Sequence, residues 1–389
     1  MYTRPHRGPF QAGERVQLTD PKGRHYTISL AADGQFQSNR GSFPHAWLIG
    51  KEEGSVVISR EGRPFLALRP LISDYVLSMP RGATVIYPKD AAQITHGADV
   101  FPGARVFEAG AGSGALSISL LDAIGEAGEL LSVERRPEFA EIAAANVISW
   151  FGTRPSCYEI RVGEAGEALL AGERAHFDHV ILDMLAPWEM IPSAVHALRP
   201  GGVFLAYVAT TTQLSRTVET LRGSGRFTEP EASETLVRTW HSEGLAVRPD
   251  HRMVAHTGFL VQARRLADGA EMTLVSRPSK GAYAGPMPWE TQTWDEDAFG
   301  ERAIAPRKLR RVRRDIAERA DIEETGSTSS HVHLERMQQR IDEELAARNM
   351  QREAGDPGAA VVVGKTEARR NGRDTGGEVS GTDDVGAPA

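Results

Sequence analysis

Four acidic residues stand at or near the ends of predicted strands, where they could bind a ligand together. Glu108 and Glu134 close two such strands, Glu164 follows a third, and Asp183 ends the apolar run V-I-L-D. Buried strands of α/β proteins rarely contain carboxylates, and ligands of these folds bind at the carboxyl ends of the parallel strands. We therefore expect these acids to surround one site.

A glycine-rich segment, F-E-A-G-A-G-S-G-A-L, follows a predicted strand and opens a predicted helix, as a nucleotide-binding loop does. Gly110, Gly112 and Gly114 let the backbone approach a ligand closely, and the start of the helix offers free N–H groups. The spacing differs from the G-x-G-x-x-G of dinucleotide enzymes, and Glu108 would repel a pyrophosphate. A cationic ligand with an amino group, such as S-adenosylmethionine, fits this loop better. Glycines that only form a tight turn are the alternative.

Three further residues are suited to the rest of such a cofactor. Glu134 can accept hydrogen bonds from both hydroxyls of a ribose, a role that would also suit NAD. Phe139 could pack on the cofactor or in the protein core. Glu164 could accept from an adenine amino group, or could be a solvated acid in a turn.

The stretch L-D-M-L-A-P-W suggests a pocket for a nucleobase. The Asp183 carboxylate could accept from an exocyclic amine while Trp188 stacks on the ring. Pro187 suits the first turn of the following helix. In the alternative interpretation, Asp183 caps that helix and Trp188 belongs to the core.

Five motifs together closely resemble those of bacterial tRNA (adenine-58-N1)-methyltransferases, especially actinobacterial ones, in family order over roughly residues 8–267. L-D-x-x-x-P-W is the most specific, because methylases of the adenine amino group carry a D/N-P-P-Y/F loop instead. The others are the glycine-rich segment, V-I-Y-P-K-D-A-A-Q, A-Y-V-A-T-T-T-Q-L and H-T-G-F-L-V.

The resemblance implies a Rossmann-like class I methyltransferase that moves a methyl group from S-adenosylmethionine to N1 of adenine 58 in the T-loop of tRNA. It also implies a homotetramer, and the tRNA substrate implies a cytoplasmic, RNA-binding enzyme. Asp183 would be the catalytic residue, and it would also lie against the cofactor. The remaining predicted cofactor residues are Glu108, Gly110, Gly112, Ser113, Gly114, Ala115, Leu116, Glu134, Phe139, Glu164 and Gln93. The predicted substrate pocket consists of Tyr87, Trp188, Tyr207 and His256.

The expected chemistry needs a fixed negative charge rather than a base. The N1 lone pair of adenine is free, so no proton has to be removed before methyl transfer. Positive charge then develops on the purine, and a carboxylate at Asp183 would stabilise it.

Composition limits the remaining possibilities. The chain of 389 residues has a net charge of −7, so RNA binding would depend on local basic residues. The single cysteine, Cys157, excludes an intramolecular disulfide. Neither a signal peptide nor an apolar run long enough to span a bilayer is predicted, and the histidines lack metal-ligand spacing. Candidate RNA contacts are Arg4, Arg7, Arg15, Lys22, Arg24, Arg40, Arg60 and Arg63.

Four regions are expected along the chain. Residues 8–70 are predicted to form a small N-terminal β domain. Residues 71–99 are predicted to form a linker with a helix around Leu71–Met79. Residues 100–267 alternate between strands and helices, which predicts a parallel sheet covered on both faces. An antiparallel pair near Glu234–His241 and Thr257–Arg264 should close this sheet. Residues 285–389 predict a charged, largely disordered tail, in which 307–324 and 333–350 could form exposed helices.

Three alternatives remain open. A methyltransferase of the same fold acting on a protein carboxyl or a small molecule would keep the glycine loop but has no need of L-D-x-x-x-P-W. An NAD-dependent oxidoreductase is disfavoured by Glu108 and by the glycine spacing. A non-catalytic RNA-binding or scaffold protein would not need a complete cofactor loop.

Overall fold

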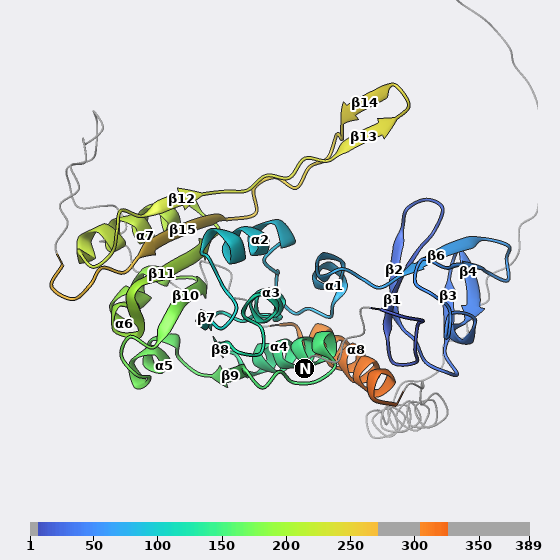
Figure 1. Ribbon diagram of the computed structural model, residues 1–389, viewed down its shortest axis with the longest axis horizontal. Coiled ribbons are helices and arrows are strands. Elements are labelled where there is room, and N and C mark those ends of the chain that lie inside the picture. Colours follow the sequence, from blue (N-terminus) through green and yellow to red (C-terminus); the bar gives the residue numbers. More distant parts are fainter. Residues whose placement is uncertain (1–6, 271–303, 326–389) are drawn as a thin grey trace, which may run out of the picture. The chain divides into compact units, whose positions relative to one another are not determined.

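Strand–helix alternation from residue 105 onwards forms a seven-stranded sheet, as the sequence predicts (Figure 1). The computed structural model describes residues 7–270 and 304–325. In the sheet the strand order is β12-β15-β11-β10-β7-β8-β9, with β7 to β11 parallel. The parallel strands are β7 (Arg105–Ala109), β8 (Glu129–Glu134), β9 (Tyr158–Val162), β10 (Phe177–Asp183) and β11 (Leu198–Val208). This is the doubly wound arrangement expected of a Rossmann-like methyltransferase.

The two faces of the sheet bury different side chains of the same strand. On β10, Ile181 packs into one apolar cluster, while Val180 and Leu182 pack into another. This alternation follows from the two-residue period of a strand. Because both faces are covered, the strand is apolar at every position between His179 and Asp183.

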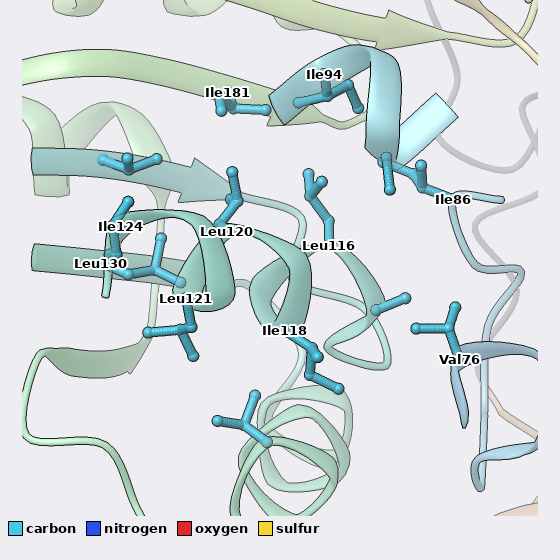
Figure 2. Close-up of a cluster of buried hydrophobic side chains, with 14 of the residues drawn as sticks. Val76, Ile86, Ile94, Leu116, Ile118, Leu120, Leu121, Ile124, Leu130 and Ile181 are labelled. Atoms are coloured by element: carbon cyan, nitrogen blue, oxygen red, sulfur yellow. The ribbon is translucent and has the colours of Figure 1, made fainter. Parts of the chain in front are cut away.

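Helices on the first face are α2 (Pro88–Gly97), α3 (Ala115–Ile124) and α4 (Pro137–Phe151). Figure 2 shows Leu116 and Leu120 of α3 in the same cluster as Ile94 of α2 and Ile181 of the sheet. The second face is covered by α5 (Ala165–Ala171), the 3-10 helix η2 (Pro187–Met190), α6 (Ile191–Ala197) and α7 (Thr211–Ser224). The carboxyl ends of the strands are thus left as the open edge.

The N-terminal region forms its own apolar core, as predicted. Its sheet has the order β2-β1-β6-β5, and a separate β3–β4 hairpin was not predicted. The strands are β1 (Arg15–Thr19), β2 (His25–Ser29), β3 (Gln35–Ser38), β4 (Gly41–Pro44), β5 (Val56–Ile58) and β6 (Pro64–Leu68). Phe36, Phe43 and Phe65 pack ring against ring in its centre.

The linker contains two helices where the sequence predicted one. Helix α1 (Ile72–Ser78) lies where it was expected, and α2 begins at Pro88 inside the Y-P-K-D motif. Proline is favoured in the first turn of a helix because it lacks an N–H and fixes φ. Tyr87, just before it, is therefore held at a helix start.

Only one of the two strands predicted for the antiparallel pair lies where the sequence placed it. Strand β15 (Phe259–Arg264) does run antiparallel to β11, but its other partner is the short β12 (Glu231–Ser233). The other segment predicted as a strand of this pair, Glu234–His241, lies outside the seven-stranded sheet, because β12 ends at Ser233. It leads into a two-stranded hairpin of β13 (Trp240–Glu243) and β14 (Ala246–Pro249), which pair only with each other among the described strands.

Helix α8 (Pro306–Thr325) confirms the helix predicted near 307–324, but it is not simply exposed. Val312 is buried in a cluster with Phe139 and Ile142 of α4, and α8 lies against α4 (Figure 1). The apolar residues of α8 recur every three or four positions, but the surrounding charges outweighed this signal in the sequence, so the docking was not predicted. The other predicted tail helix, 333–350, lies outside the described residues.

No helix in the described part of the chain is both long enough and apolar enough to cross a membrane.

Candidate active site

A cavity of about 300 Å³ opens at the carboxyl edge of the sheet, between the ends of β7, β8, β9 and β10. Three of the four acids that the sequence placed around one site line it, which confirms the expected juxtaposition for these three. Its lining includes Gly110, Glu134, Arg136, Gly163, Glu164 and Asp183. Each belongs to a strand end or to the loop that follows, so parallel pairing alone brings them together.

The glycine loop passes so close to β10 that one of its positions excludes every side chain. Gly110 has φ +82°, and a Cβ there would lie 1.8 Å from the carbonyl oxygen of Asp183. Gly114 also has a positive φ, and its Cβ would lie 2.9 Å from the carbonyl oxygen of Ala143 on α4. These glycines therefore do more than make a turn, because they allow the loop to seat against β10 and α4.

Glu134 ties the loop to the second strand. Its carboxylate accepts a hydrogen bond from the Gly112 N–H at 3.0 Å and others from the backbone and side chain of Arg136 at 3.1 Å. The side chain is almost fully buried and points toward the cavity lined by the loop. A ribose placed against the loop would meet this acceptor, so the residues present fit a nucleoside-containing cofactor.

Asp183 is a half-buried acid without a hydrogen-bond partner among the described residues. Burial, with Glu108 and Glu134 adding repulsion, raises the pKa of Asp183 to about 7, and Arg136 opposes the shift. The helix after it begins at Pro187 with Ala186 as its N-cap and has no side-chain cap. Asp183 is therefore not the capping residue of that helix, and its carboxylate is left available.

Tyr207 places a second polar group at the same edge of the sheet, beside Asp183. Asp183 and Tyr207 are paired in register on β10 and β11, and the Tyr207 hydroxyl donates to the Thr257 carbonyl at 2.7 Å. Burial raises the pKa of Tyr207 to about 12, with smaller contributions from Asp90, Asp183 and Tyr87. The predicted pocket residue Tyr207 is thus brought beside Asp183, and Tyr87 lies close enough to Tyr207 to influence its pKa.

The sequence did not predict a buried, hydrogen-bonded group next to Tyr207, which consists of Lys89, Asp90 and Thr257. The Lys89 ammonium donates to Asp90 and to the Thr257 hydroxyl, each at 2.6 Å, and that hydroxyl donates to Asp90 at 2.6 Å. Both charged side chains are nearly inaccessible. The adjacent opposite charges in Y-P-K-D were the available signal, since a buried charge needs a partner.

Asn146 is another missed residue. Its side-chain amide donates to the carbonyl oxygens of Pro80 and Ser113, at 2.8 and 2.9 Å. It therefore joins the linker, helix α4 and the glycine loop from a fully buried position. No sequence pattern distinguishes this asparagine from others in helices, so its hydrogen bonds to the linker and the glycine loop could not be predicted.

Several predicted residues do not line the cavity, among them Glu108, Phe139 and Trp188. Glu108 is completely buried and accepts hydrogen bonds from Ser117 and Ser132; burial raises its pKa, which disfavours the negative charge attributed to it. Phe139 packs in the core against α8, with Arg136 over its ring. Trp188 is buried under Arg216 rather than forming a pocket wall. The core alternatives for Phe139 and Trp188 are the correct ones.

The remaining predicted residues lie around the loop or outside the cavity. Ser113, Ala115 and Leu116 are buried at the start of α3. Gln93 lies on the solvent-exposed side of α2. His256 is exposed, with Nδ1 2.9 Å from Glu234.

Two family models match the chain. The TrmI-like N-terminal family matches residues 8–57, and the family described as tRNA methyltransferase complex GCD14 subunit matches residues 67–245. Together they span the N-terminal β domain, the linker and most of the sheet domain.

Known proteins show the same similarity. A tRNA (adenine(58)-N(1))-methyltransferase TrmI of Thermus thermophilus is 36% identical over 248 residues, which are 64% of this chain and 95% of the relative. Its counterpart from Methanocaldococcus jannaschii, named for adenines 57 and 58, is 28% identical over 64% of this chain and 93% of its own length.

Two solved structures are similar over most of the described residues. A SAM-dependent O-methyltransferase of Thermotoga maritima has a TM-score of 0.62 and 29% identity, covering 66% of this chain and 95% of that protein. The tRNA (m1A58) methyltransferase TrmI of Aquifex aeolicus has a TM-score of 0.58 and 26% identity, covering 67% of this chain and 100% of that protein.

Proposed function

Since the chain belongs to the family of bacterial tRNA (adenine-58-N1)-methyltransferases, we propose that it methylates N1 of adenine 58 in tRNA with S-adenosylmethionine as donor. The observation that carries this proposal is the cavity that joins the glycine loop, Glu134 and Asp183 at one edge of the sheet. It offers a place for a nucleoside cofactor next to an acid without a partner.

The cofactor would lie along the glycine loop. Gly110, Gly112 and Gly114 allow close approach, Glu134 would accept from the ribose hydroxyls, and Glu164 would accept from the adenine amino group. Glu164 lines the cavity and is exposed, which supports this assignment. When bound, S-adenosylmethionine supplies a methyl group activated on a sulfonium.

Asp183 would orient the target adenine and stabilise its developing charge. Its ionised carboxylate accepts from the adenine amino group, which directs N1 at the methyl group. As N1 accepts the methyl, positive charge spreads over the purine, and the fixed negative charge beside it lowers the barrier. Holding the two reactants in line supplies much of the remaining acceleration.

Tyr87 and Tyr207 would form the walls of the adenine pocket. Gly258 supports this arrangement, because a Cβ there would lie 2.3 Å from the ring of Tyr207. The buried Lys89–Asp90–Thr257 group would hold the start of α2 against the loop before β15, whose Thr257 carbonyl accepts from the Tyr207 hydroxyl. His256 would contact the RNA near the pocket entrance rather than the base, because it is exposed.

The N-terminal β domain, residues 8–70, would help to hold the RNA, and residues 100–267 would carry out catalysis. Arg60, Arg63 and Lys22 are exposed and suit phosphate contacts. Arg15 does not, since its guanidinium donates to the Ser149 side chain at 2.6 Å and lies over the Tyr75 ring. We place the enzyme in the cytoplasm, where its substrate is made and used.

We also propose a homotetramer. Trp240 and Val247 on the β13–β14 hairpin and Leu245 at its turn are largely exposed, with Leu245 fully so. Apolar side chains gathered on a protruding hairpin suit contact with other subunits.

The decisive experiment is methylation of unmodified tRNA transcripts with labelled S-adenosylmethionine, followed by mapping of the modified nucleotide. We expect one N1-methyladenosine at position 58 and none when that adenine is replaced by guanine. Methylation of a small molecule or protein carboxyl, with tRNA unmodified, would contradict the proposal. That outcome would favour the alternative enzyme of the same fold.

A further inference from the structure

Helix α8 is docked on the catalytic domain by an apolar stripe. Leu309, Val312 and Ile316 recur at intervals of three and four residues, so they lie on one side of the helix. They pack with Phe139 and Ile142 of α4, and α8 lies along α4 (Figure 1). This face of α8 is therefore covered.

Two polar contacts fix the docked helix. Arg313 forms a two-pronged ion pair with Glu141 of α4, with its shortest distance at 2.5 Å. The Lys308 ammonium donates to the Gly82 carbonyl at 2.9 Å. Gly82 lies shortly before Tyr87 along the chain, and α4 starts shortly after Glu134. The helix is thus attached to the two segments that lead into and out of the candidate site.

The opposite side of α8 is a stripe of arginines. Arg307, Arg310, Arg311 and Arg314 follow the same three- and four-residue spacing, about half a turn away from the apolar stripe. All four are exposed. Arg307, Arg310 and Arg311 have no ion pair or hydrogen bond within residues 7–270 and 304–325, and Arg314 lies 3.7 Å from Asp315 and Glu318.

Helix stability does not explain this placement. Positive side chains near the start of a helix oppose its dipole and destabilise it, whereas acids would be favoured there. Yet six of the eight residues from 307 to 314 are basic, and the acids of α8 follow from residue 315 onwards. The arrangement is therefore unfavourable for the helix alone and favourable for binding an anion.

The anionic partner is a phosphate backbone rather than a membrane. Basic amphipathic helices bind membranes by burying their apolar face in lipid, but α4 covers that face of α8. We propose that the arginine stripe binds the phosphate backbone of the tRNA whose adenine enters the site. This inference rests on the proposed function. It concerns a helix beyond the last residue of either family match.

The test uses the full chain with Arg307, Arg310 and Arg311 all replaced by glutamine. We expect the dissociation constant for tRNA to rise about tenfold near ~0.1 M salt, and the slope of log K against log salt to become shallower by about two to three. The turnover number at saturating tRNA and the affinity for S-adenosylmethionine should not change.

Two control variants separate this contact from general electrostatics and from folding. Replacing the same three arginines by lysine keeps the charge and should retain most of the affinity. Replacing the exposed Arg154, Arg174 and Arg222 by glutamine removes an equal charge elsewhere and should have little effect. Equal weakening by this second control would overturn the proposal.

Unchanged affinity and salt slope in the glutamine variant, with tRNA methylation intact, would also overturn the α8 contact and leave the proposed function standing. Absence of methylation at adenine 58 by the unaltered chain would instead overturn the proposed function.

Discussion

At the scale of single residues, the proposed mechanism depends on Asp183. It lines the cavity, its carboxylate has no hydrogen-bond partner among the described residues, and it is paired in register with Tyr207. We expect Asp183→Ala to lower single-turnover methylation by about two to three powers of ten. Equilibrium binding of S-adenosylmethionine should survive, because the glycine loop and Glu134 are untouched. Near-normal single-turnover rates would remove Asp183 from the mechanism.

The raised pKa of Asp183 predicts a pH dependence. In the proposed mechanism methyl transfer requires the ionised Asp183 carboxylate, and the pKa of this group is raised from 3.8 to about 7. Because kcat/KM reports ionisations of the free enzyme, it should fall about tenfold per pH unit below 7 and level off above. The residual kcat/KM of Asp183→Asn should not show this decrease below about pH 7. A profile that is flat between about pH 5.5 and about pH 8 would contradict the assignment.

The same shift has a consequence for stability. The folded state holds the Asp183 proton more tightly than the unfolded state, so ionisation disfavours folding. The free energy of unfolding of the natural chain should therefore fall relative to that of Asp183→Asn as pH rises from about 4 to about 7. Urea unfolding of both proteins across this range measures the difference, and a constant gap would contradict the shift.

At the scale of elements, the glycine loop is held by contact with β10. Gly110→Ala would place a methyl group against the Asp183 carbonyl in a backbone conformation that alanine avoids. We expect affinity for S-adenosylmethionine to fall at least about tenfold, since the loop must move away from β10. Gly225→Ala is the matched control, because Gly225 also has positive φ but faces open space. Similar losses in both would point to backbone strain alone.

The junction between α2 and the loop before β15 depends on buried charges. Asp90→Ala would leave the Lys89 ammonium buried without its partner, which costs roughly 3–5 kcal/mol of unfolding free energy. Urea denaturation measures this loss. Replacing Lys89 by methionine in the same variant should recover much of it, because the unpaired charge is then gone. Failure of the second change to recover stability would assign the loss to packing instead.

At the scale of the whole molecule, the exposed hairpin should control assembly. Changing Trp240, Leu245 and Val247 to serine removes apolar surface from β13–β14 and its turn without touching the sheet domain's cores. Light scattering should then show a smaller assembly than the tetramer proposed for the natural chain. Binding of S-adenosylmethionine serves as a control for folding. An unchanged mass would show that other surfaces hold the subunits together.

Much of the architecture could be predicted from the sequence, because it depends on local patterns. Strand–helix alternation predicted the parallel sheet, and the apolar run before Asp183 predicted a buried strand that ends in an acid. Parallel pairing then requires strand ends to share one edge, so the meeting of Glu134, Glu164 and Asp183 followed from sequence and topology alone.

Only the tertiary structure decided which side chains reach the cavity. Trp188, Phe139 and Glu108 have residue types suited to a site, yet packing turns each into the interior, beside Arg216, Ile142 and Ser117 respectively. Lys89, Asp90 and Thr257 became partners because two segments far apart in sequence meet beside β11. Residue type and spacing determine where a strand ends and which groups are available, whereas side-chain direction and long-range contacts depend on how the elements pack.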